Sequence, residues 1–297
     1  MGAVYVGAPP TAQFTPIFTS SLITHLVLYA AFYLTTAVLA LWSDSPLRAW
    51  KFGKLAPSYA VLRHELLYGL GSVLVLSLYD AAVLWDVATG AGYTRVDPEL
   101  TLSLGFLAVW VVFAGLLAEA HFYWTHRALH ASPFLYRHVH KVHHESRDPN
   151  PLSGISFHPV ESAIYFSSVL CGVALLPMNV ELYHAWRIAL FVFPIPGHIG
   201  LGTRHWTLEW LSFNHYLHHT KTHCNYGGFV FWDRLCGTDY ATWQAARDEA
   251  ARTKLKADAY PVSDAYAESV RAAGSPAIRR SGRRAASPAR PSKAHAA

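Results

Sequence analysis

The sequence predicts an all-α integral membrane protein with four to five transmembrane helices and a cytosolic cap of helices rich in histidine. Two observations lead to this fold class. Hydrophobic residues make up 52% of the 297-residue chain and charged residues only 14%, with a mean hydropathy of +0.19, which is hard to reconcile with a wholly soluble globule. Fifteen of the 18 histidines lie between His121 and His223, so one region of the chain is set apart by its chemistry.

Five apolar stretches are candidates for crossing a bilayer, which takes about 20 mostly apolar residues per helix. The last of them is the weakest because Arg187, Pro194 and Pro196 interrupt it. We therefore expect four spans and a fifth that is broken or partly re-entrant. The five stretches are residues 17–42, 66–85, 100–118, 162–179 and 182–202.

Basic residues predict how these spans are oriented. Four of them lie in the loop that ends at His64, whereas the loop at 86–99 contains only Arg95. Short cytoplasmic loops carry an excess of lysine and arginine. The first loop is therefore expected in the cytosol and the second on the opposite side. By alternation, the segments 121–158 and 206–297 are also expected in the cytosol.

Charge and composition divide the chain into three parts. Residues 1–99 are expected to be membrane anchor helices, residues 100–245 a domain that carries the histidines, and residues 246–297 a basic tail predicted to be disordered. Seven basic and two acidic residues follow Pro261, so the segment after Pro261 accounts for the whole net charge of +5, and no nucleic-acid partner is expected. Three cysteines without a C-x-x-C pair predict neither a disulfide framework nor a thiolate zinc site.

Eight histidines fall into three clusters with regular spacing. Residues i, i+3 and i+4 share one face of an α-helix, so each cluster is expected to aim two or three imidazoles at the same point. A zinc site uses three or four ligands, and eight imidazoles therefore indicate two metal ions. Imidazole suits iron, copper, zinc and nickel alike, so the ligand type does not select the metal. The clusters are His126-x-x-x-His130, His140-x-x-His143-His144 and His215-x-x-His218-His219.

The remaining histidines have different expected roles. His198 follows the broken fifth span and is expected to complete a metal site, with His158 and His121 as weaker candidates. His25 and His184 stand alone in apolar segments, where a histidine is usually a hydrogen-bonded structural residue. Surface positions, or positions behind the metal ligands, are expected for His138, His205 and His223, while His295 belongs to the tail.

Several motifs together resemble one protein family. The three histidine clusters are accompanied in the sequence by His158-Pro-Val-Glu161, Asn225-Tyr226-Gly227 and the run 232–238. In order and spacing these motifs are similar to the integral-membrane fatty acid hydroxylase and sterol desaturase superfamily, over about residues 119–240. The resemblance implies a non-haem di-iron centre on the cytosolic side of the spans, within a catalytic domain at 100–245. The implied iron ligands are His126, His130, His140, His143, His144, His198, His215, His218 and His219.

The resemblance also implies an activity, in which O2 and two electrons hydroxylate or desaturate a lipid. The motifs are closest to sterol C5-desaturases and sterol C4-methyl oxidases, which favours a sterol and the endoplasmic reticulum over a fatty-acyl or sphingolipid substrate. Metal binding or support of the ligand rings is further implied for His121, His158, Glu119, Glu161 and Asp233. Relatives often carry Asp where this chain has Glu119.

Electrons are expected to come from outside the chain. The sequence contains no G-x-G-x-x-G after a strand, no P-loop and no thiolate cluster, so no nicotinamide site is predicted. The resemblance implies a cytochrome b5-type carrier and its reductase, which pass on electrons from NAD(P)H. Arg137 and Lys141 lie among the histidine clusters and are expected to dock that carrier. Pairing of these two side chains with anionic lipid headgroups is the alternative.

Two other classes of protein remain alternatives. A metal transporter would also combine spans with many histidines, but its ligands should lie at the depth of the membrane midplane. The clusters here are expected beyond the ends of the spans on one side, which favours the enzyme. A catalytically inactive, lipid-binding relative is the second alternative, and the complete set of ligands argues against it.

Overall fold

The computed structural model describes residues 10–41, 51–52, 57–200 and 206–259. Within these residues the secondary structure is helical, apart from isolated bridge residues at Lys51 and at the pair Val96–Met178, and the predicted all-α class is confirmed. Most of the basic tail, His205 and His295 lie outside the described residues, as does most of the first loop. Contacts divide the chain into one compact unit that ends at Ala246 and another that begins at Arg247.

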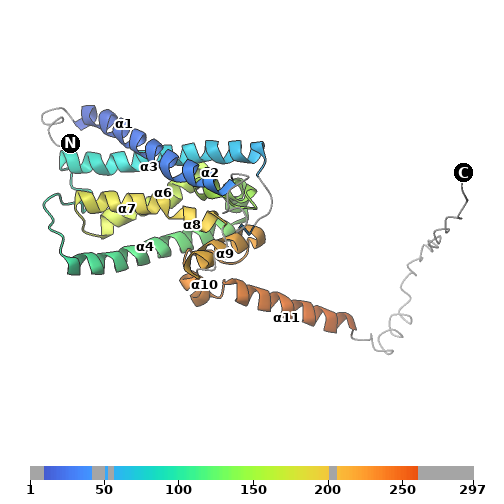
Figure 1. Cartoon of the computed structure of the whole chain (residues 1–297). Coiled ribbons are helices and arrows are strands. Elements are labelled where there is room, and N and C mark those ends of the chain that lie inside the picture. Colours follow the sequence, from blue (N-terminus) through green and yellow to red (C-terminus); the bar gives the residue numbers. More distant parts are fainter. Residues whose placement is uncertain (1–9, 42–50, 53–56, 201–205, 260–297) are drawn as a thin grey trace, which may run out of the picture. The chain divides into compact units, whose positions relative to one another are not determined.

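The helices follow one another in the order that Figure 1 shows. They are α1 (Pro10–Leu28), the π-helical η1 (Tyr29–Leu34), α2 (Thr35–Leu41), α3 (Tyr59–Thr89), α4 (Leu104–Ala131), α5 (Pro133–His138), the 3-10 helices η3 (His140–Glu145) and η4 (Pro151–Ile155), α6 (Pro159–Leu175), α7 (Val180–Val192), α8 (Pro194–His198), α9 (Trp206–Lys221), α10 (Phe231–Cys236) and α11 (Tyr240–Ala259).

Three helical stretches are long and apolar enough to cross a membrane. They are Ala12–Leu41, Tyr59–Thr89 and Leu104–Ala131. Ser58 and Ser103 begin the second and third stretches, since each hydroxyl accepts from a backbone N–H of the first helical turn. A membrane protein is confirmed in this sense, and the first three expected spans correspond to these helices with shifted ends.

The expected count of four to five spans is not confirmed. The helix at the fourth candidate, α6, has 17 residues, and the helix at the fifth, α7, has 13. At 1.5 Å per residue these helices are about 25 and 20 Å long, short of a hydrocarbon core of about 30 Å. Proline sets the limits: Pro159 occupies the first turn of α6, and α7 ends at Val192 just before Pro194.

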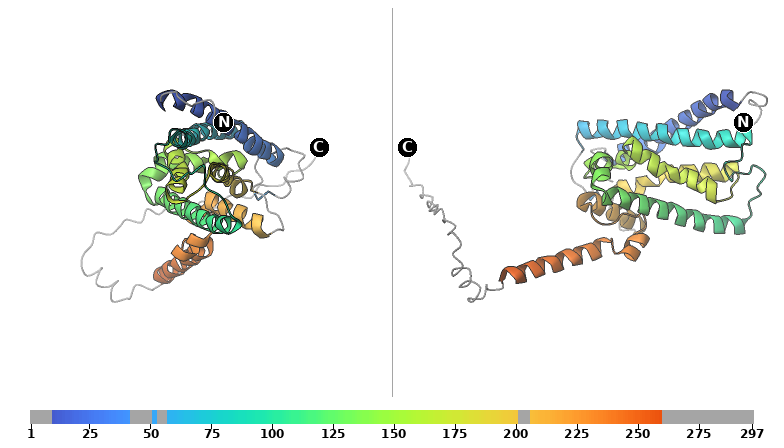
Figure 2. Two further views of the ribbon diagram at one scale, coloured as in Figure 1. Left: turned by 90° about the vertical axis from the view of Figure 1, so that its left-hand side faces the viewer. Right: turned by 180° about the vertical axis from the view of Figure 1, so that it is seen from behind.

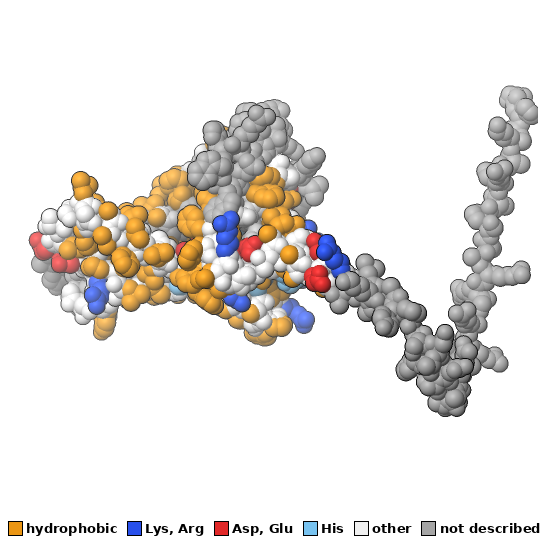
Figure 3. Space-filling view, turned by 90° about the horizontal axis from the view of Figure 1, so that it is seen from below, with side chains coloured by type: hydrophobic (Ala, Val, Ile, Leu, Met, Phe, Trp, Pro, Cys, Tyr) orange, Lys and Arg blue, Asp and Glu red, His pale blue; other side chains and the backbone are white. Residues whose placement is uncertain are grey.

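The helices of the first unit pack in layers. α1 lies along α3, α3 packs against α6, and α4 packs against the other side of α6 (Figures 1 and 2). Phe166 and Phe191 are completely buried between the layers. In contrast, α4 exposes a row of apolar side chains, and Figure 3 shows that such side chains dominate the face seen from below. The exposed side chains of α4 include Val109, Val111, Val112, Phe113 and Leu116.

A buried polar cluster ties α1, α3 and α7 together, and we call it the Asp80 cluster. Asp80 accepts from the Tyr183 hydroxyl (2.7 Å) and pairs with Nε of Arg187 (3.2 Å). Arg187 in turn donates to Nε2 of His25 (2.8 Å). Because the charges are paired inside an apolar bundle, they fix how the three helices fit together. Its members are Ser21, His25, Ser77, Asp80, Tyr183, His184 and Arg187.

Candidate metal centre

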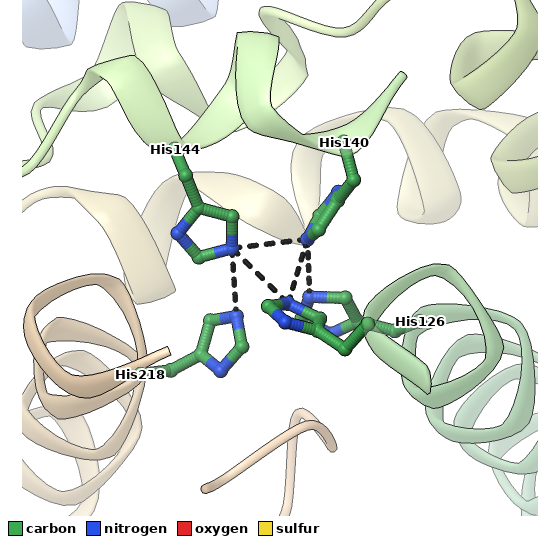
Figure 4. Close-up of side chains that lie close together, drawn as sticks. His126, His140, His144 and His218 are labelled. Carbon is green, nitrogen blue, oxygen red and sulfur yellow. Dashed lines mark hydrogen bonds between the residues drawn. The ribbon is translucent and has the colours of Figure 1, made fainter. Parts of the chain in front are cut away.

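The nine histidines singled out in the sequence form two groups, each with its candidate ligand atoms within 4.8 Å of one another. Figure 4 labels four members of the first group, which point towards one another from the three elements α4, η3 and α9. The first histidine group is His126, His130, His140, His144 and His218. The second histidine group is His143, His198, His215 and His219.

The local structure explains how the groups are divided. α4 supplies His126 and His130 from its last turns, which lie within the long apolar helix rather than beyond it. This helix is about 42 Å long, so its end extends past a hydrocarbon core of about 30 Å. η3 is a 3-10 helix where an α-helix was expected. The remaining histidines of the two groups lie on α9, except His198, which ends α8.

Each triplet with the pattern H-x-x-H-H is shared between the two groups. From η3, His140 and His144 enter the first group and His143 enters the second. From α9, His215 and His219 enter the second group and His218 enters the first. In each triplet, the histidines at i and i+4 therefore belong to the same group, and the histidine at i+3 belongs to the other group. The expectation that each cluster aims two or three imidazoles at one point is confirmed with two, the histidines at i and i+4.

In the first group, the ring nitrogens that face one another are Nε2 atoms. Nε2 of His140 lies 3.1, 2.9 and 3.0 Å from Nε2 of His126, His130 and His144. Nδ1 of His126 donates to the Tyr226 carbonyl oxygen (2.7 Å). A carbonyl oxygen can only accept, so Nδ1 carries the proton and Nε2 of the neutral ring is a bare lone pair.

The same argument fixes two further rings. Nδ1 of His218 donates to the Cys224 carbonyl (2.8 Å), and Nδ1 of His198 donates to the Pro194 carbonyl (2.7 Å). In the second group, Nε2 of His198 lies 2.9 Å from Nε2 of His215 and 3.4 Å from that of His143. Nε2 of His126, His198 and His218 therefore presents a lone pair to its group, which is the form of imidazole that binds a metal ion. The donor set of both groups therefore fits metal ions.

The nitrogen spacing bears on the coordination geometry. Two imidazoles bound at about 2.1 Å are separated by about 3.0 Å when they bind at right angles and by about 3.4 Å in a tetrahedron. The Nε2 pairs of the first group that lie in contact are 2.9 to 3.2 Å apart. In the second group, Nε2 of His198 lies 3.3 Å from Nε2 of His219 and 3.4 Å from that of His143, so the spacings of the two groups cover both geometries.

Burial keeps these imidazoles neutral. It lowers the pKa of His140, His144 and His218 well below the usual value, and it lowers the pKa of His198 to about 4. Neutral imidazole is the form that binds metal. Among the described residues neither group includes a carboxylate. The neutral ligands would therefore not neutralise the positive charge of bound divalent ions.

Acidic residues support the rings from behind. Glu161 accepts from Nδ1 of His140 (2.6 Å), directly as the sequence suggested. Glu119 and Asp233 instead lie one step further back: Glu119 accepts from the backbone N–H of Phe229 (2.9 Å), and Asp233 accepts from that of Tyr226 (2.8 Å). They hold the loop 224–229, whose carbonyl oxygens orient His126 and His218.

The loop 224–229 was not predicted as part of the site. Its contribution comes from backbone carbonyls, for which a sequence carries no side-chain signal. Gly227 was a hint, because a Cβ there would lie 2.7 Å from Oε1 of Glu119 and 3.0 Å from Oδ2 of Asp233. Only glycine fits between the two carboxylates. Asn225 and Val230 adopt left-handed φ values of 56° and 57°, a conformation that persists only where surrounding contacts impose it.

Other candidates lie outside the two histidine groups. His121 contacts the Ser167 hydroxyl (2.9 Å), and His158 caps α6 by accepting from a backbone N–H. Arg137 and Lys141 are exposed on α5 and η3, beside the first group.

An apolar cavity of about 430 Å³ leads to the histidines. It runs from Trp110 and Trp186 to His126 and His198. Trp110 and His126 are 16 positions apart on α4, which corresponds to about 24 Å along the helix axis. Trp110 and Trp186 pack edge to face at the far end, with ring centroids 5.8 Å apart. The cavity therefore suits a long, apolar molecule with one end at the histidines.

Comparisons with known proteins agree with this geometry. Residues 111–238 match the family described as Fatty acid hydroxylase. The chain is 32% identical to a Delta(7)-sterol 5(6)-desaturase of Gibberella zeae, over 47% of this chain and 43% of that protein. It is 32% identical to methylsterol monooxygenase 1 of Rattus norvegicus, over 42% of this chain and 44% of that protein.

A third relative differs in its named activity. The very-long-chain aldehyde decarbonylase GL1-8 of Oryza sativa subsp. indica is 31% identical, over 48% of this chain and 57% of that protein. The chain thus spans about half the length of the relatives it matches. No solved structure matches it.

Proposed function

Since residues 111–238 match the fatty acid hydroxylase family, we propose that the chain is a membrane-bound oxidoreductase that uses O2 to oxidise a lipid at two non-haem iron ions. The observation that carries this proposal is the position of the two histidine groups. Nine neutral imidazoles stand side by side at one end of a long apolar cavity.

The histidines are proposed to hold one iron in each group. The iron ions, when bound, would activate O2 strongly enough to remove hydrogen from an unactivated carbon, which no ordinary side chain can do. Iron is preferred over zinc because zinc has no redox chemistry.

The protein's own part is to orient the ligands and exclude water. Glu161 and the carbonyl oxygens of Tyr226, Cys224 and Pro194 hold four imidazoles by their Nδ1–H groups, which keeps Nε2 directed at the metal. The apolar cavity wall excludes water and leaves a lipid carbon as the neighbour of the site.

A sterol is the proposed substrate, with a fatty-acyl or sphingolipid chain as the alternative. Two of the relatives described above are named for sterol chemistry, one a desaturase and one a monooxygenase. Hydroxylation and desaturation both consume O2, two electrons and two protons, and they release one and two waters respectively. The proposed location is the endoplasmic reticulum membrane, with the site on the cytosolic side.

A cytochrome b5-type carrier and its reductase are the proposed source of electrons, ultimately from NAD(P)H. This proposal is supported by exposed basic side chains beside the first histidine group. Arg137 and Lys141 could meet an acidic carrier there.

Lipid profiling of cells that express the wild type, His143→Ala or His25→Ala tests the proposed function. The wild type and His25→Ala should both produce the same oxidised sterol, and His143→Ala should not. A changed 2-hydroxy fatty acid instead of a sterol would move the substrate to the fatty-acyl class. Unchanged lipids together with changed cellular metal uptake would contradict the enzyme and support a transporter.

A further inference from the structure

The cavity has an opening along one side of the bundle, between α4 and α7. Four of its lining residues are exposed at the surface of these two helices: Val111 and Gly115 on α4, and Ala185 and Ala189 on α7. α6 packs against both helices, whereas the backbones of α4 and α7 lie apart, and these two helices meet through the rings of Trp110 and Trp186. Beside this contact, the seam that Gly115 and Ala189 line is a slit in the cavity wall.

Small residues keep this slit open. A Cβ added at Gly115 would meet no atom within 4 Å, and the two residues across the seam are alanines. Larger side chains at these positions would fill the gap between the helices. The opening faces the same surroundings as Val112 and Phe113, which are exposed on the apolar face of α4. In a membrane-spanning helix, that surface meets lipid rather than water.

The end of the slit nearest the histidines is closed by two aromatic rings. Phe193, just after α7, packs on Phe229 with ring centroids 5.3 Å apart. A Cβ at Gly228 would lie 3.0 Å from Cε1 of Phe193, so this ring also covers the loop backbone. Glu119 of α4 holds that backbone through the N–H of Phe229. The closure therefore links α4, through Glu119 and the loop backbone, to the end of α7.

We propose that a lipid from the bilayer enters the cavity sideways through the slit between α4 and α7, past Gly115 and Ala189, while the Phe193–Phe229 pair shields the metal end. This proposal rests on the proposed function, because it assigns the path of that enzyme's substrate. A lipid already in the membrane would reach the histidines without leaving the apolar phase, so its passage would need no exposure to water.

Photolabelling of the cavity tests the path independently of turnover. The protein is reconstituted into phosphatidylcholine vesicles that contain either a diazirine-bearing cholesterol or a diazirine-bearing phosphatidylcholine. After irradiation, labelled cavity peptides are measured by mass spectrometry. The variants are Gly115→Leu combined with Ala189→Leu, and Gly105→Leu as a matched control. Gly105 also lies on α4 with no atom within 4 Å of an added Cβ, but it does not line the cavity.

Gly115→Leu combined with Ala189→Leu should lower cavity labelling about tenfold relative to the wild type, with at least one of the two probes, because two leucines would overfill the slit. Gly105→Leu should label like the wild type. Equal labelling in all three proteins, equal loss in the control, or no cavity labelling of the wild type with either probe would overturn the proposed path. The metal content of the same samples is also measured. Blocking the slit should leave the metal content unchanged, so this measurement separates a blocked path from a failure of the proposed function.

Discussion

The molecule contains two buried polar clusters that differ in how their charges and lone pairs are satisfied. In the Asp80 cluster, a carboxylate is paired with a guanidinium and the neutral groups around them act as donors or acceptors. In the two histidine groups, the ring nitrogens of neutral imidazoles face one another, with no anion among the described residues of either group. The charges of the Asp80 cluster are therefore paired within the chain, whereas the donor set of the histidine groups fits cations.

A single residue from each cluster shows what separates a structural histidine from a ligand. His25 has both nitrogens engaged, since Nε2 accepts from Arg187 (2.8 Å) and Nδ1 contacts the Ser77 hydroxyl (3.1 Å). His126 has one nitrogen engaged by a carbonyl, and the other faces His140. Both histidines are buried, so burial does not distinguish them. The partners of the two ring nitrogens distinguish His25 from His126.

The largest expected effect comes from removing one ligand. His218→Ala should abolish turnover and most of the bound iron, because it removes a bond to the metal rather than a group behind the ligand. His25→Ala should keep both. Metal analysis and turnover of purified protein, at equal folded content by circular dichroism, make the comparison. Normal turnover in His218→Ala would remove the distinction between the two clusters.

Asp80→Asn should act on stability rather than on metal. It leaves Arg187 as a buried charge without its carboxylate partner, which typically costs about 3–5 kcal/mol of folding free energy. Thermal unfolding in detergent should show a lower Tm, while iron per folded chain should stay at the wild-type value. Arg187→Met in the Asp80→Asn background should recover part of the Tm, because an apolar side chain needs no partner there. A wild-type Tm in Asp80→Asn would show that the ion pair does not hold the helices.

Glu119→Gln should have an intermediate effect. The carboxylate accepts from two backbone N–H groups of the loop 224–229, and its loss should loosen the carbonyl that orients His126. Losing such a supporting group typically lowers metal affinity or activity by about 10 to 100-fold. Competition with a chelator measures the affinity. Glu181→Gln, an exposed acid at the start of α7, is the matched control and should bind iron normally.

The smallest expected effect concerns the surface beside the first histidine group. Arg137→Glu combined with Lys141→Glu should slow turnover driven by a cytochrome b5-type carrier a few-fold, and only at low ionic strength, because exposed charges are screened beyond a Debye length of about 8 Å at physiological salt. Iron content should not change. A loss that persists at high salt would point to damage of the site rather than to docking.

The sequence predicted the composition of the site better than its arrangement. Spacing of i and i+4 correctly predicted that His140 and His144, or His215 and His219, would share a group. It could not predict that His143 and His218 cross to the other group, because the 3-10 form of η3 and the relative placement of η3 and α9 depend on tertiary packing.

The membrane segments show the same limit. Apolar composition located the three long helices, whose ends are set by local signals such as Ser58 and Ser103. It also suggested two further spans where the helices prove to be short, because an apolar run inside a bundle has the same composition as one that faces lipid. The packing of the helices around the run distinguishes these two cases, and the composition of the run does not.

Iron stoichiometry tests the central claim most directly. Wild-type protein purified from cells supplied with iron should contain about two iron ions per chain by inductively coupled plasma mass spectrometry, one for each histidine group. His25→Ala, with an altered Asp80 cluster, should contain the same amount. One iron or less per chain in fully folded wild-type protein, or zinc in place of iron, would contradict the assignment of two iron sites.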